Sequence, residues 1–545
     1  MFCSFTKIPF NNFFLFILSL GVFSRIFFYF YFGQDYLNFE DYKASLKYLD
    51  ALSDHSWEFL KNYHYKPIGF ILKDILIFHF FGHIEKINFL LTSCLDIFVT
   101  ILLGSILYIF GVRSEVTILT CSIFSLNLIG WEYWRSGNHF DHLNVFIFSF
   151  YTWSIVKFIF NNNTLNCFFV GFSSILLVLF YSLGYIIIPI ITSLIFLFGK
   201  INLKTKSFIY LIFLPFLTIL IILAKNFITV GVMAPSSLGG ANTLQFASYS
   251  EPNFNHFDTN TIVRISKKVK TKEWWHWCLN QSFKHNSKGY LQGQTFGKCF
   301  TKKGNEIDFT NLKTKLEALN ETKILQAVEL DEKLVKNKPW FFSKSNNFHF
   351  SVMYMQEGMK IWKYLIFNEP FNFLKRAYWS ARLYFKGLYF FTNTKYEPNH
   401  MINNNIIKVA ALFTGPILLL GVLNAFYKCF QLIYFPIVNL KNVTKENTIF
   451  LSIKQLPICL LSILFILTSL FLIIVTYGEN SRMFVSISVI PFFLGVLKIN
   501  DIIINNKFIK SIPVITLLFI AINIFLLFLY DHFFEYIFNN FIKFI

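Results

Sequence analysis

Long apolar blocks separated by short polar stretches dominate the chain. About eleven blocks have the length that a helix needs to cross a bilayer. They lie near residues 8–32, 87–110, 115–131, 141–160, 166–183, 185–199, 207–230, 406–427, 448–475, 483–498 and 511–530. So many long segments with few charges are not typical of soluble proteins. The pattern predicts an all-α polytopic membrane protein with about 11 transmembrane helices, in a range of roughly 10 to 13.

The blocks divide the chain into three parts. Residues 1–230 form an N-terminal transmembrane bundle with a first outer loop at 33–86, residues 231–405 form a large, mostly helical loop domain, and residues 406–545 form C-terminal transmembrane helices. The first block follows Lys7 and has no small-residue cleavage pattern behind it, so it is expected to be a retained helix.

Orientation follows from the Lys and Arg residues of the short loops, which favour the cytoplasmic side. A cytoplasmic N-terminus puts most of these residues inside, namely Arg113, Lys200, Lys204, Lys206, Lys428, Lys441, Lys445, Lys498, Lys507 and Lys510. The large loop then lies outside, because long loops cross largely regardless of charge. We expect a bacterial inner (plasma) membrane protein.

Composition narrows the class of partner. The chain is 55% hydrophobic and 14% charged, with a net charge of +19. No soluble basic domain stands apart, so the charge suits an anionic membrane surface and not nucleic acid. Nucleotide-binding glycine loops and the HExxH zinc motif are absent from the sequence.

The stretch "GQDYLNFEDYK" after the first block offers three acids, Asp35, Glu40 and Asp41. A carboxylate at a membrane surface can accept a proton from an attacking hydroxyl or bind a metal that orients a phosphate. The alternative is a solvated loop whose acids face water.

"YHYKPIGFILKDILIFHFFG", residues 63–82, is too short and interrupted to span. It predicts an amphipathic helix in the interface plane with Pro67 in its first turn. Lys66 would face phosphate head groups, either to bind a substrate or simply to anchor the helix in lipid.

Two further polar clusters adjoin apolar blocks. "WEYWRSGNHFDH" includes Arg135, His139 and Asp141, and two His with one Asp are metal-ligand types, although the spacing matches no specific zinc signature. An unmetallated polar site and a plain membrane interface are the alternatives. "TYGENSR" places Glu479, Asn480 and Arg482 at the outer mouth of two helices, where charges imply pairing or function.

The large loop offers less chemistry. Residues 233–246 are small and able to present backbone N–H groups to an anion, or to act as a flexible connection. Residues 309–339 predict an amphipathic helix burying Leu312, Leu316, Leu319, Val328 and Leu330. Residues 368–391 mix aromatic and basic side chains as interfacial helices do.

Cysteine usage adds one expectation about the same loop. Of the eight Cys, Cys278 and Cys299 fall in this segment, where the outer compartment permits a disulfide between them.

The order of these motifs resembles that of the GT-C superfamily of integral-membrane glycosyltransferases, which includes protein O-mannosyltransferases and the aminoarabinose transferase of lipid A. The resemblance rests on "GQDYLNFEDY", "YKPIGFILKDILIFHFFG", "HFDHLNVF" and "GENSRMFVSISVIPFF", and covers roughly 1–230 and 406–500. Members often carry paired acids in the first loop. Here Tyr36 follows Asp35, which keeps Glu40 and Asp41 as candidates beside it.

The resemblance implies transfer of a sugar from a polyprenyl-phosphate donor to an acceptor hydroxyl of a lipid, glycan or protein on the outer face of the membrane. The catalytic base would come from Asp35, Glu40 or Asp41, and the donor phosphate would be held by Lys66, Arg135 and Arg482. Asp141, His139, Glu479 and Asn480 would orient substrate. Whether a divalent metal ion takes part stays open.

Two other functions are consistent with this architecture. An O-antigen ligase or polymerase also has about a dozen spans and one large outer loop, in which its essential Arg and His tend to lie. A transporter or flippase of lipid-linked substrates would carry internal repeats, broken helices and midplane charges. The sequence shows neither internal repeats nor broken helices with midplane charges, and its charges are expected at the outer edge.

Overall fold

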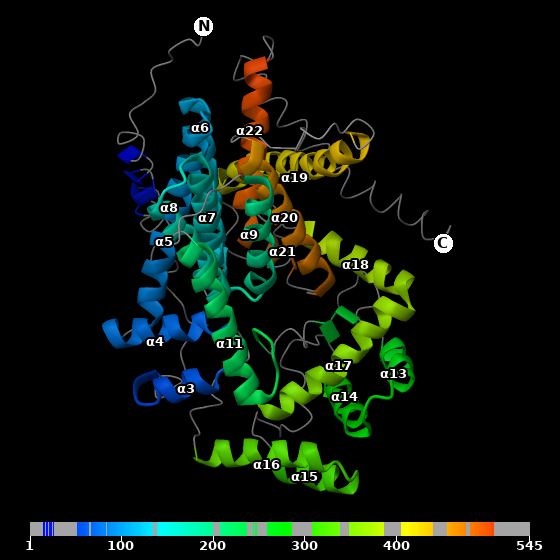
Figure 1. Cartoon of the computed structure of the whole chain (residues 1–545). Coiled ribbons are helices and arrows are strands. Elements are labelled where there is room, and N and C mark those ends of the chain that lie inside the picture. The colour runs from blue at the N-terminus through cyan, green and yellow to red at the C-terminus, as the bar shows by residue number, and fades with distance from the viewer. Residues whose placement is uncertain are drawn as a thin grey trace.

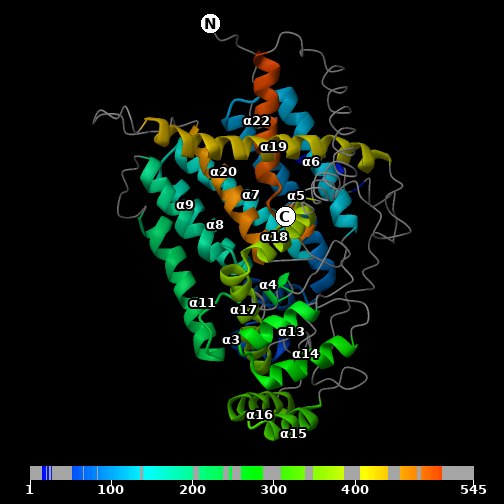
Figure 2. The ribbon, with the colours of Figure 1, turned by 90° about the vertical axis from the view of Figure 1, so that its right-hand side faces the viewer.

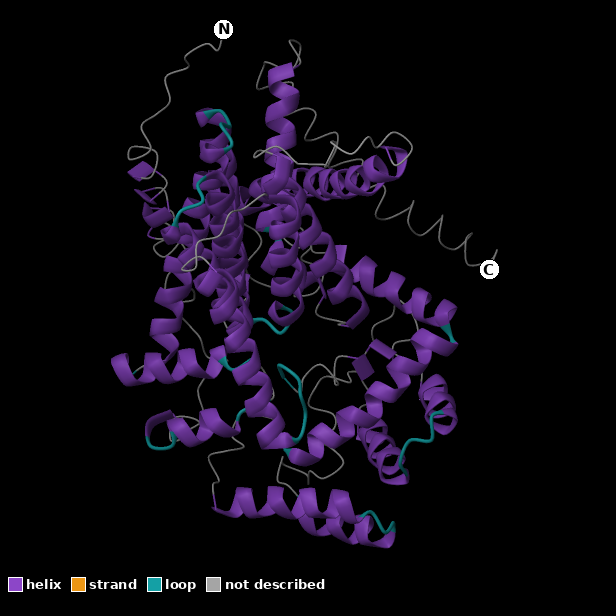
Figure 3. Ribbon diagram, in the orientation of Figure 1, coloured by secondary structure: helices purple, strands orange, loops and turns teal. Residues whose placement is uncertain are grey.

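The structure is a computed structural model. It describes residues 52–64, 67–82, 84–134, 139–199, 208–236, 243–244, 246–247, 259–285, 308–337, 348–385, 405–439, 455–475 and 480–505, with short helical pieces between 15 and 26. Within these ranges every regular element is a helix (Figure 3). The all-helical part of the fold prediction is therefore confirmed for the described chain.

Apolar helices make up one end of the molecule (Figure 1). They are α5 (Ile84–Ile109), α6 (Ser114–Trp134), α7 (His139–Phe160), α8 (Thr164–Phe180), α9 (Gly184–Gly199), η3 (Ile209–Phe213), α11 (Leu214–Val230), α19 (Asn405–Asn439), α20 (Gln455–Val475), α21 (Asn480–Ile487) and α22 (Val489–Asn505). Five segments in the described chain are long and apolar enough to cross a membrane: Leu90–Ile109, Leu143–Phe160, Ile209–Val230, Thr414–Leu432 and Gln455–Val475. These helices identify a membrane protein.

Contacts between the helices define two ends of the bundle. At one end the Arg113 N–H donates to Asn500 Oδ1 at 3.4 Å, and the ring of Phe110 lies 5.3 Å from that of Phe160. At the other end Trp362 Nε1 donates to the Ile474 carbonyl at 3.0 Å. The α5–α6 turn, the end of α7 and the middle of α22 thus lie together, opposite the end of α20.

Segments before and after the large loop share one hydrophobic core. It includes Val99 on α5, Phe148 on α7, Leu418 on α19, Leu460 on α20 and Val485 on α21, all essentially inaccessible to solvent. Continuous apolar runs favour this arrangement, because a helix that is apolar all round has to be buried or face lipid.

α19 and α22 cross at unusually close range. A Cβ added at Gly421 would lie 1.6 Å from the Pro491 carbonyl oxygen, and one added at Gly495 would lie 2.0 Å from that of Ile417. Glycine on both helices therefore allows their backbones to touch. The span predicted at 406–427 is helical, but α19 runs across the bundle instead of along it (Figures 1 and 2).

The span predicted at 483–498 is divided into two helices. α21 ends at Ile487 and α22 begins at Val489, while the Ser488 N–H still donates to the Val485 carbonyl at 3.1 Å. Pro491 lies in the first turn of α22, where its missing N–H costs little. The spans predicted at 8–32 and 511–530 lie largely or wholly outside the described residues.

A second hydrophobic core belongs to the large loop. Its helices are α13 (Thr259–Lys268), α14 (Glu273–His285), α15 (Phe309–Ala318), α16 (Thr322–Asn337), α17 (His349–Asn368) and α18 (Pro370–Phe385). Trp274, Trp275, Leu312, Val328 and Tyr354 are buried together in it. In Figure 2, α13 to α16 lie below α7, α20 and α22, whereas α18 lies at the height of the lower end of α20.

The prediction of a single helix over 309–339 is wrong in one respect, because two helices occupy this stretch. Asn320 takes the left-handed conformation at φ 53° and separates α15 from α16. Asparagine tolerates this conformation better than most residues. Leu312, Leu316 and Val328 are buried as predicted, but Leu330 is exposed.

The helix predicted within 63–82 is present, but it is not amphipathic. α4 (Gly69–Phe81) follows α3 (Ser56–Asn62), and Pro67 precedes its first turn. Phe70 and Ile75 are buried, whereas Phe80 and Phe81 are exposed, so both faces are apolar. α4 lies across the end of α5 (Figure 1).

Local capping signals explain several helix ends. The Asn163 side chain accepts from the Asn166 N–H at 2.8 Å and begins α8, and Asp308 does the same for Asn311 at the start of α15. Gly82 and Gly231, both at φ 70°, close α4 and α11 in the left-handed conformation that glycine permits.

Cys278 is disulfide-bonded, and its partner lies outside the described residues. Five other cysteines are free: Cys94, Cys121, Cys167, Cys429 and Cys459. The predicted pairing of Cys278 with Cys299 stays a prediction.

A charged contact joins the loop domain to α11. His349 Nδ1 lies 2.8 Å from Asp331 Oδ1, and the ring also hydrogen-bonds the Thr229 backbone at the end of α11. Asp331 in addition accepts from the backbone N–H groups of His349 and Phe350, each at 3.0 Å, and so caps α17. The hydrogen bond to Asp331 raises the pKa of His349 above its ordinary value of 6.5.

We expect this contact to make the stability of the full chain depend on pH. A raised pKa means that the contribution is complete below about pH 6.5 and is lost as pH rises through the folded-state value. Thermal unfolding of His349→Gln in detergent should show a flatter pH profile. The control His79→Gln, at an exposed position of α4, should keep the wild-type profile, and an unchanged profile in His349→Gln would contradict the expectation.

Candidate functional site

The described residues include only part of the predicted site. Six of its residues lie outside the described ranges: Asp35, Glu40, Asp41, Lys66, Arg135 and Glu479. His139 and Asp141 belong to α7, and Asn480 and Arg482 to α21; for these four only the backbone is described.

The helices that carry Asp141 and Arg482 pack against each other. Asp141 lies in the first turn of α7, whose last residue, Phe160, lies beside Phe110 at the far end of the bundle. Arg482 lies in the first turn of α21, shortly after Ile474 contacts the loop domain. Both helices therefore begin at the end of the bundle that faces the loop domain.

A cation missed by the sequence analysis lies at that same end. The Lys225 ammonium, near the end of α11, donates to the Tyr63 carbonyl and to Asn226 Oδ1, the latter at 3.2 Å. Tyr63 is the first residue of the stretch 63–82, which also holds Lys66 and Pro67. The signal was present in the sequence, because a Lys inside an apolar run is costly and implies a role.

Asn226 connects this cation to the small-residue stretch after α11. Its Nδ2 donates to the carbonyls of Ala234 at 2.7 Å and Pro235 at 3.1 Å, and Ser236 Oγ lies 3.3 Å from Ser182 Oγ. The stretch thus offers carbonyl acceptors to Asn226, and the Ala234 N–H donates to Val232. The predicted use of its N–H groups for an anion is not supported at Ala234.

A carboxylate inside the bundle departs from the expectation that charges lie at the outer edge. Asp96 is completely buried within the candidate span Leu90–Ile109. Trp153 Nε1 donates to Ser105 Oγ at 3.0 Å and so aligns α5 with α7. Asp96 precedes Ser105 by as many residues as Asn144 precedes Trp153, so Asp96 and Asn144 lie at the same level of the bundle. Asn144 is buried, and its Oδ1 has no hydrogen-bond partner in the described chain. Buried intramembrane acids commonly mark functional sites.

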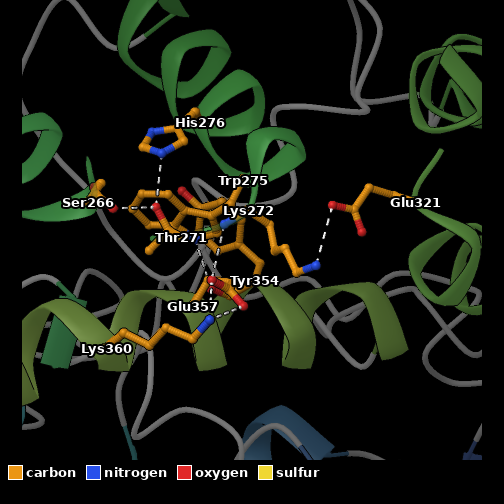
Figure 4. A network of polar contacts seen from close by, with 9 residues as sticks. All are labelled: Ser266, Thr271, Lys272, Trp275, His276, Glu321, Tyr354, Glu357 and Lys360. Carbon is orange, nitrogen blue, oxygen red and sulfur yellow. Dashed lines mark hydrogen bonds and ion pairs between the residues drawn. The ribbon is translucent and has the colours of Figure 1, made fainter. Parts of the chain in front are cut away.

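Polar groups of the loop domain are largely occupied by contacts that hold it together (Figure 4). Thr271 Oγ1 lies 3.0 Å from His276 Nε2, and Trp275 Nε1 donates to the Tyr354 carbonyl at 3.0 Å. Burial, with Lys267 nearby, lowers the pKa of His276, so its ring is neutral at pH 7. The contact of Trp275 with Tyr354 joins α14 to α17.

An ion pair connects α13 to the α17–α18 junction. Arg264 binds both carboxylate oxygens of Glu369, at 2.5 and 2.8 Å, and Asn372 adds a third donor at 2.8 Å. The Arg264 hydrogen bonds lower the pKa of Glu369 to about 2. Such bidentate geometry fixes the relative position of two helices.

Metal binding gains no further support from the described side chains. No three His, Cys, Asp or Glu residues among them come together as ligands. The side chains of His139, Asp141 and His142 are not among those described, so metal binding by these three residues stays a hypothesis from the sequence.

Comparisons with known proteins give no relative. No family model, curated protein or solved structure matches the chain. The function is therefore inferred from the chain's own residues.

Proposed function

We propose that the protein is a membrane glycosyltransferase, which moves a sugar from a polyprenyl-phosphate donor to an acceptor hydroxyl on the outer face of the membrane. The observation that carries the proposal is the common origin of α7 and α21 at the loop-domain end of the bundle. Asp141 and Arg482, which are far apart in sequence, lie in the first turns of these two packed helices. Lys225 adds a cation at the same end.

The chemistry requires an acid-base group and a cationic clamp. The acceptor oxygen attacks the anomeric carbon, its proton passes to a carboxylate, and the bond from the anomeric carbon to the phosphate oxygen breaks. Asp35 is the first choice for the carboxylate, with Glu40 and Asp41 as alternatives. Arg482, Lys66 and Arg135 stabilise the departing phosphate.

The remaining polar residues of the site orient these groups. Glu479 and Asn480 hold Arg482 or a substrate hydroxyl, and Asp141 with His139 positions the sugar. The donor reaches the site from the membrane because a lipid-linked phosphate lies in the interface. The large loop contributes acceptor specificity.

The proposal also includes the topology of the chain in the membrane. About 11 spans, a cytoplasmic N-terminus and an outward active site place the loop domain outside a bacterial inner membrane. The disulfide at Cys278 supports an oxidising compartment for that loop.

Tags test this threading directly. We expect tags near Lys204 and Lys445 to be protected from impermeant reagents in intact cells, and tags near Asn286 and Ser481 to be labelled, because the positive-inside rule favours this arrangement. Permeabilised cells, in which all four positions react, provide the control. Lys204 and Asn286 on one side of the membrane would contradict the threading and separate the proposed site residues.

A transporter of lipid-linked substrates is the second candidate. Asp96 inside a span and the break between α21 and α22 favour it, because transporters use buried charges and interrupted helices. An O-antigen ligase or polymerase is less supported, since Arg264, His276 and His349 in the loop domain are engaged in contacts between its helices.

Mass spectrometry of cell-surface glycans and glycolipids tests the proposed function in the cell. Cells lacking the protein should lack one sugar addition, and the wild-type gene should restore it. The Arg482→Lys variant keeps the charge but not the bidentate geometry, so it should restore the addition only weakly. Identical glycans with and without the protein would contradict the proposal.

A further inference from the structure

The junction between α17 and α18 presents an unusual surface. Within this α17–α18 turn (residues 363–375), Phe367 is 78% exposed, Phe371 75% and Leu374 60%. Phe371, Leu374 and Lys375 lie three and four positions apart on α18, so they share one face. The opposite face, with Arg376 and Tyr384, is buried. Large apolar side chains so close together are seldom left to water.

Contacts with α20 fix the position of this turn along the candidate membrane span of α20. Trp362, one residue before the turn, donates to Ile474 at the end of the candidate span Gln455–Val475. At the other end of α18, Tyr384 OH lies 2.8 Å from Ser469 Oγ. Ser469 is six residues inside the span, which corresponds to about 9 Å along a helix. α18 therefore runs from the edge of the span to a position within it.

The charges around the turn complement an anionic surface. Lys363, Lys375 and Lys268 are exposed near its apolar side chains, and Lys268 Nζ lies 5.9 Å from the centre of the Tyr364 ring. The one acid of the turn, Glu369, is bound by Arg264. The surface thus combines large apolar side chains with exposed positive charge, as membrane-surface helices do.

We propose that the α17–α18 turn inserts Phe367, Phe371 and Leu374 into the membrane leaflet at the loop-domain end of the bundle and holds anionic lipid head groups with its lysines. The loop domain is then anchored to the bilayer at the side of the bundle, independently of its covalent connections. This anchor does not depend on the proposed glycosyl transfer. It fixes the position of α17 and α18 against α20 and α21.

Photo-crosslinking in the full chain tests the anchor. The protein carries benzoylphenylalanine in place of Phe371 and is reconstituted in nanodiscs of phosphatidylcholine and phosphatidylglycerol. The matched control carries it in place of Leu330, which is also exposed, at 53%, but lies on α16, beyond the end of α11 and its candidate span Ile209–Val230 (Figure 1). Lipid adducts, measured by mass spectrometry, should be about tenfold more frequent at position 371, as expected from burial of one aromatic side chain in lipid.

A second variant separates the apolar and charged parts of the proposal. Lys375→Gln should leave adducts at position 371 in place but lower the share that contains phosphatidylglycerol. Equal adduct yields at positions 371 and 330 would overturn the proposal, as would crosslinks from position 371 to a second copy of the chain instead of lipid. Size-exclusion profiles identical to wild type establish that each variant is folded.

Discussion

Replacing Asp35 by Asn is expected to lower turnover by roughly 100-fold to 10,000-fold while donor binding changes little. The amide keeps the size of the side chain but cannot accept the proton of the acceptor hydroxyl. The loss should therefore appear in the chemical step and not in the affinity for the lipid-linked sugar. Single-turnover rates and donor binding, measured on purified protein in nanodiscs, separate the two.

Matched substitutions in the same loop identify which carboxylate acts as base. Glu40→Gln and Asp41→Asn should retain most activity if Asp35 is the base. Full transferase activity in purified Asp35→Asn protein would remove this residue from the mechanism and transfer the role to Glu40 or Asp41. Loss of folded protein in detergent would be recognised by size-exclusion chromatography before any rate is compared.

Replacing Gly421 by Leu is expected to separate α19 from α22 and to cost about 3 kcal/mol or more in stability. Even the first carbon of a side chain would meet the Pro491 carbonyl oxygen at 1.6 Å, and backbone atoms cannot rotate away as a side chain can. Both helices must therefore move apart, and the core that they share must open. The midpoint of thermal unfolding in detergent should fall by several degrees.

Leu423→Phe serves as the control for this substitution. Leu423 lies on the same helix but is exposed, so added volume there meets no neighbouring backbone. Its unfolding midpoint should match wild type. A Gly421→Leu protein as stable as wild type would mean that the two helices do not cross as closely as described.

Much of the fold is predictable because apolar blocks of bilayer length leave the chain few alternatives. The helices α5 to α11 and α20 coincide with predicted spans. The orientation of α19 is not predictable in this way, because the close approach at Gly421 and Gly495 is a property of the crossing and not of either segment. The break at Asn320 is also not predictable in this way, because the leucine spacing on both sides of it is that of one continuous helix.

The candidate site is only partly predictable for a different reason. A motif identifies side chains able to perform chemistry, but not the cations that tertiary structure brings beside them. Lys225 was hidden within an apolar run, and the contact of its ammonium with the Tyr63 carbonyl places it near the Lys-Pro motif. Asp96 was missed similarly, because one acid hardly changes the hydropathy of a span.

The bond between sugar and phosphate is broken by a glycosyltransferase and left intact by a transporter, so its fate distinguishes the two functions. Purified protein in nanodiscs is supplied with a panel of polyprenyl-phosphate sugars and candidate acceptors, and free polyprenyl phosphate is measured by mass spectrometry. We expect release of polyprenyl phosphate together with a glycosylated acceptor, both dependent on the protein and abolished in Asp35→Asn. Passage of intact sugar-linked lipid from one leaflet to the other, with no bond between sugar and phosphate broken, would contradict it.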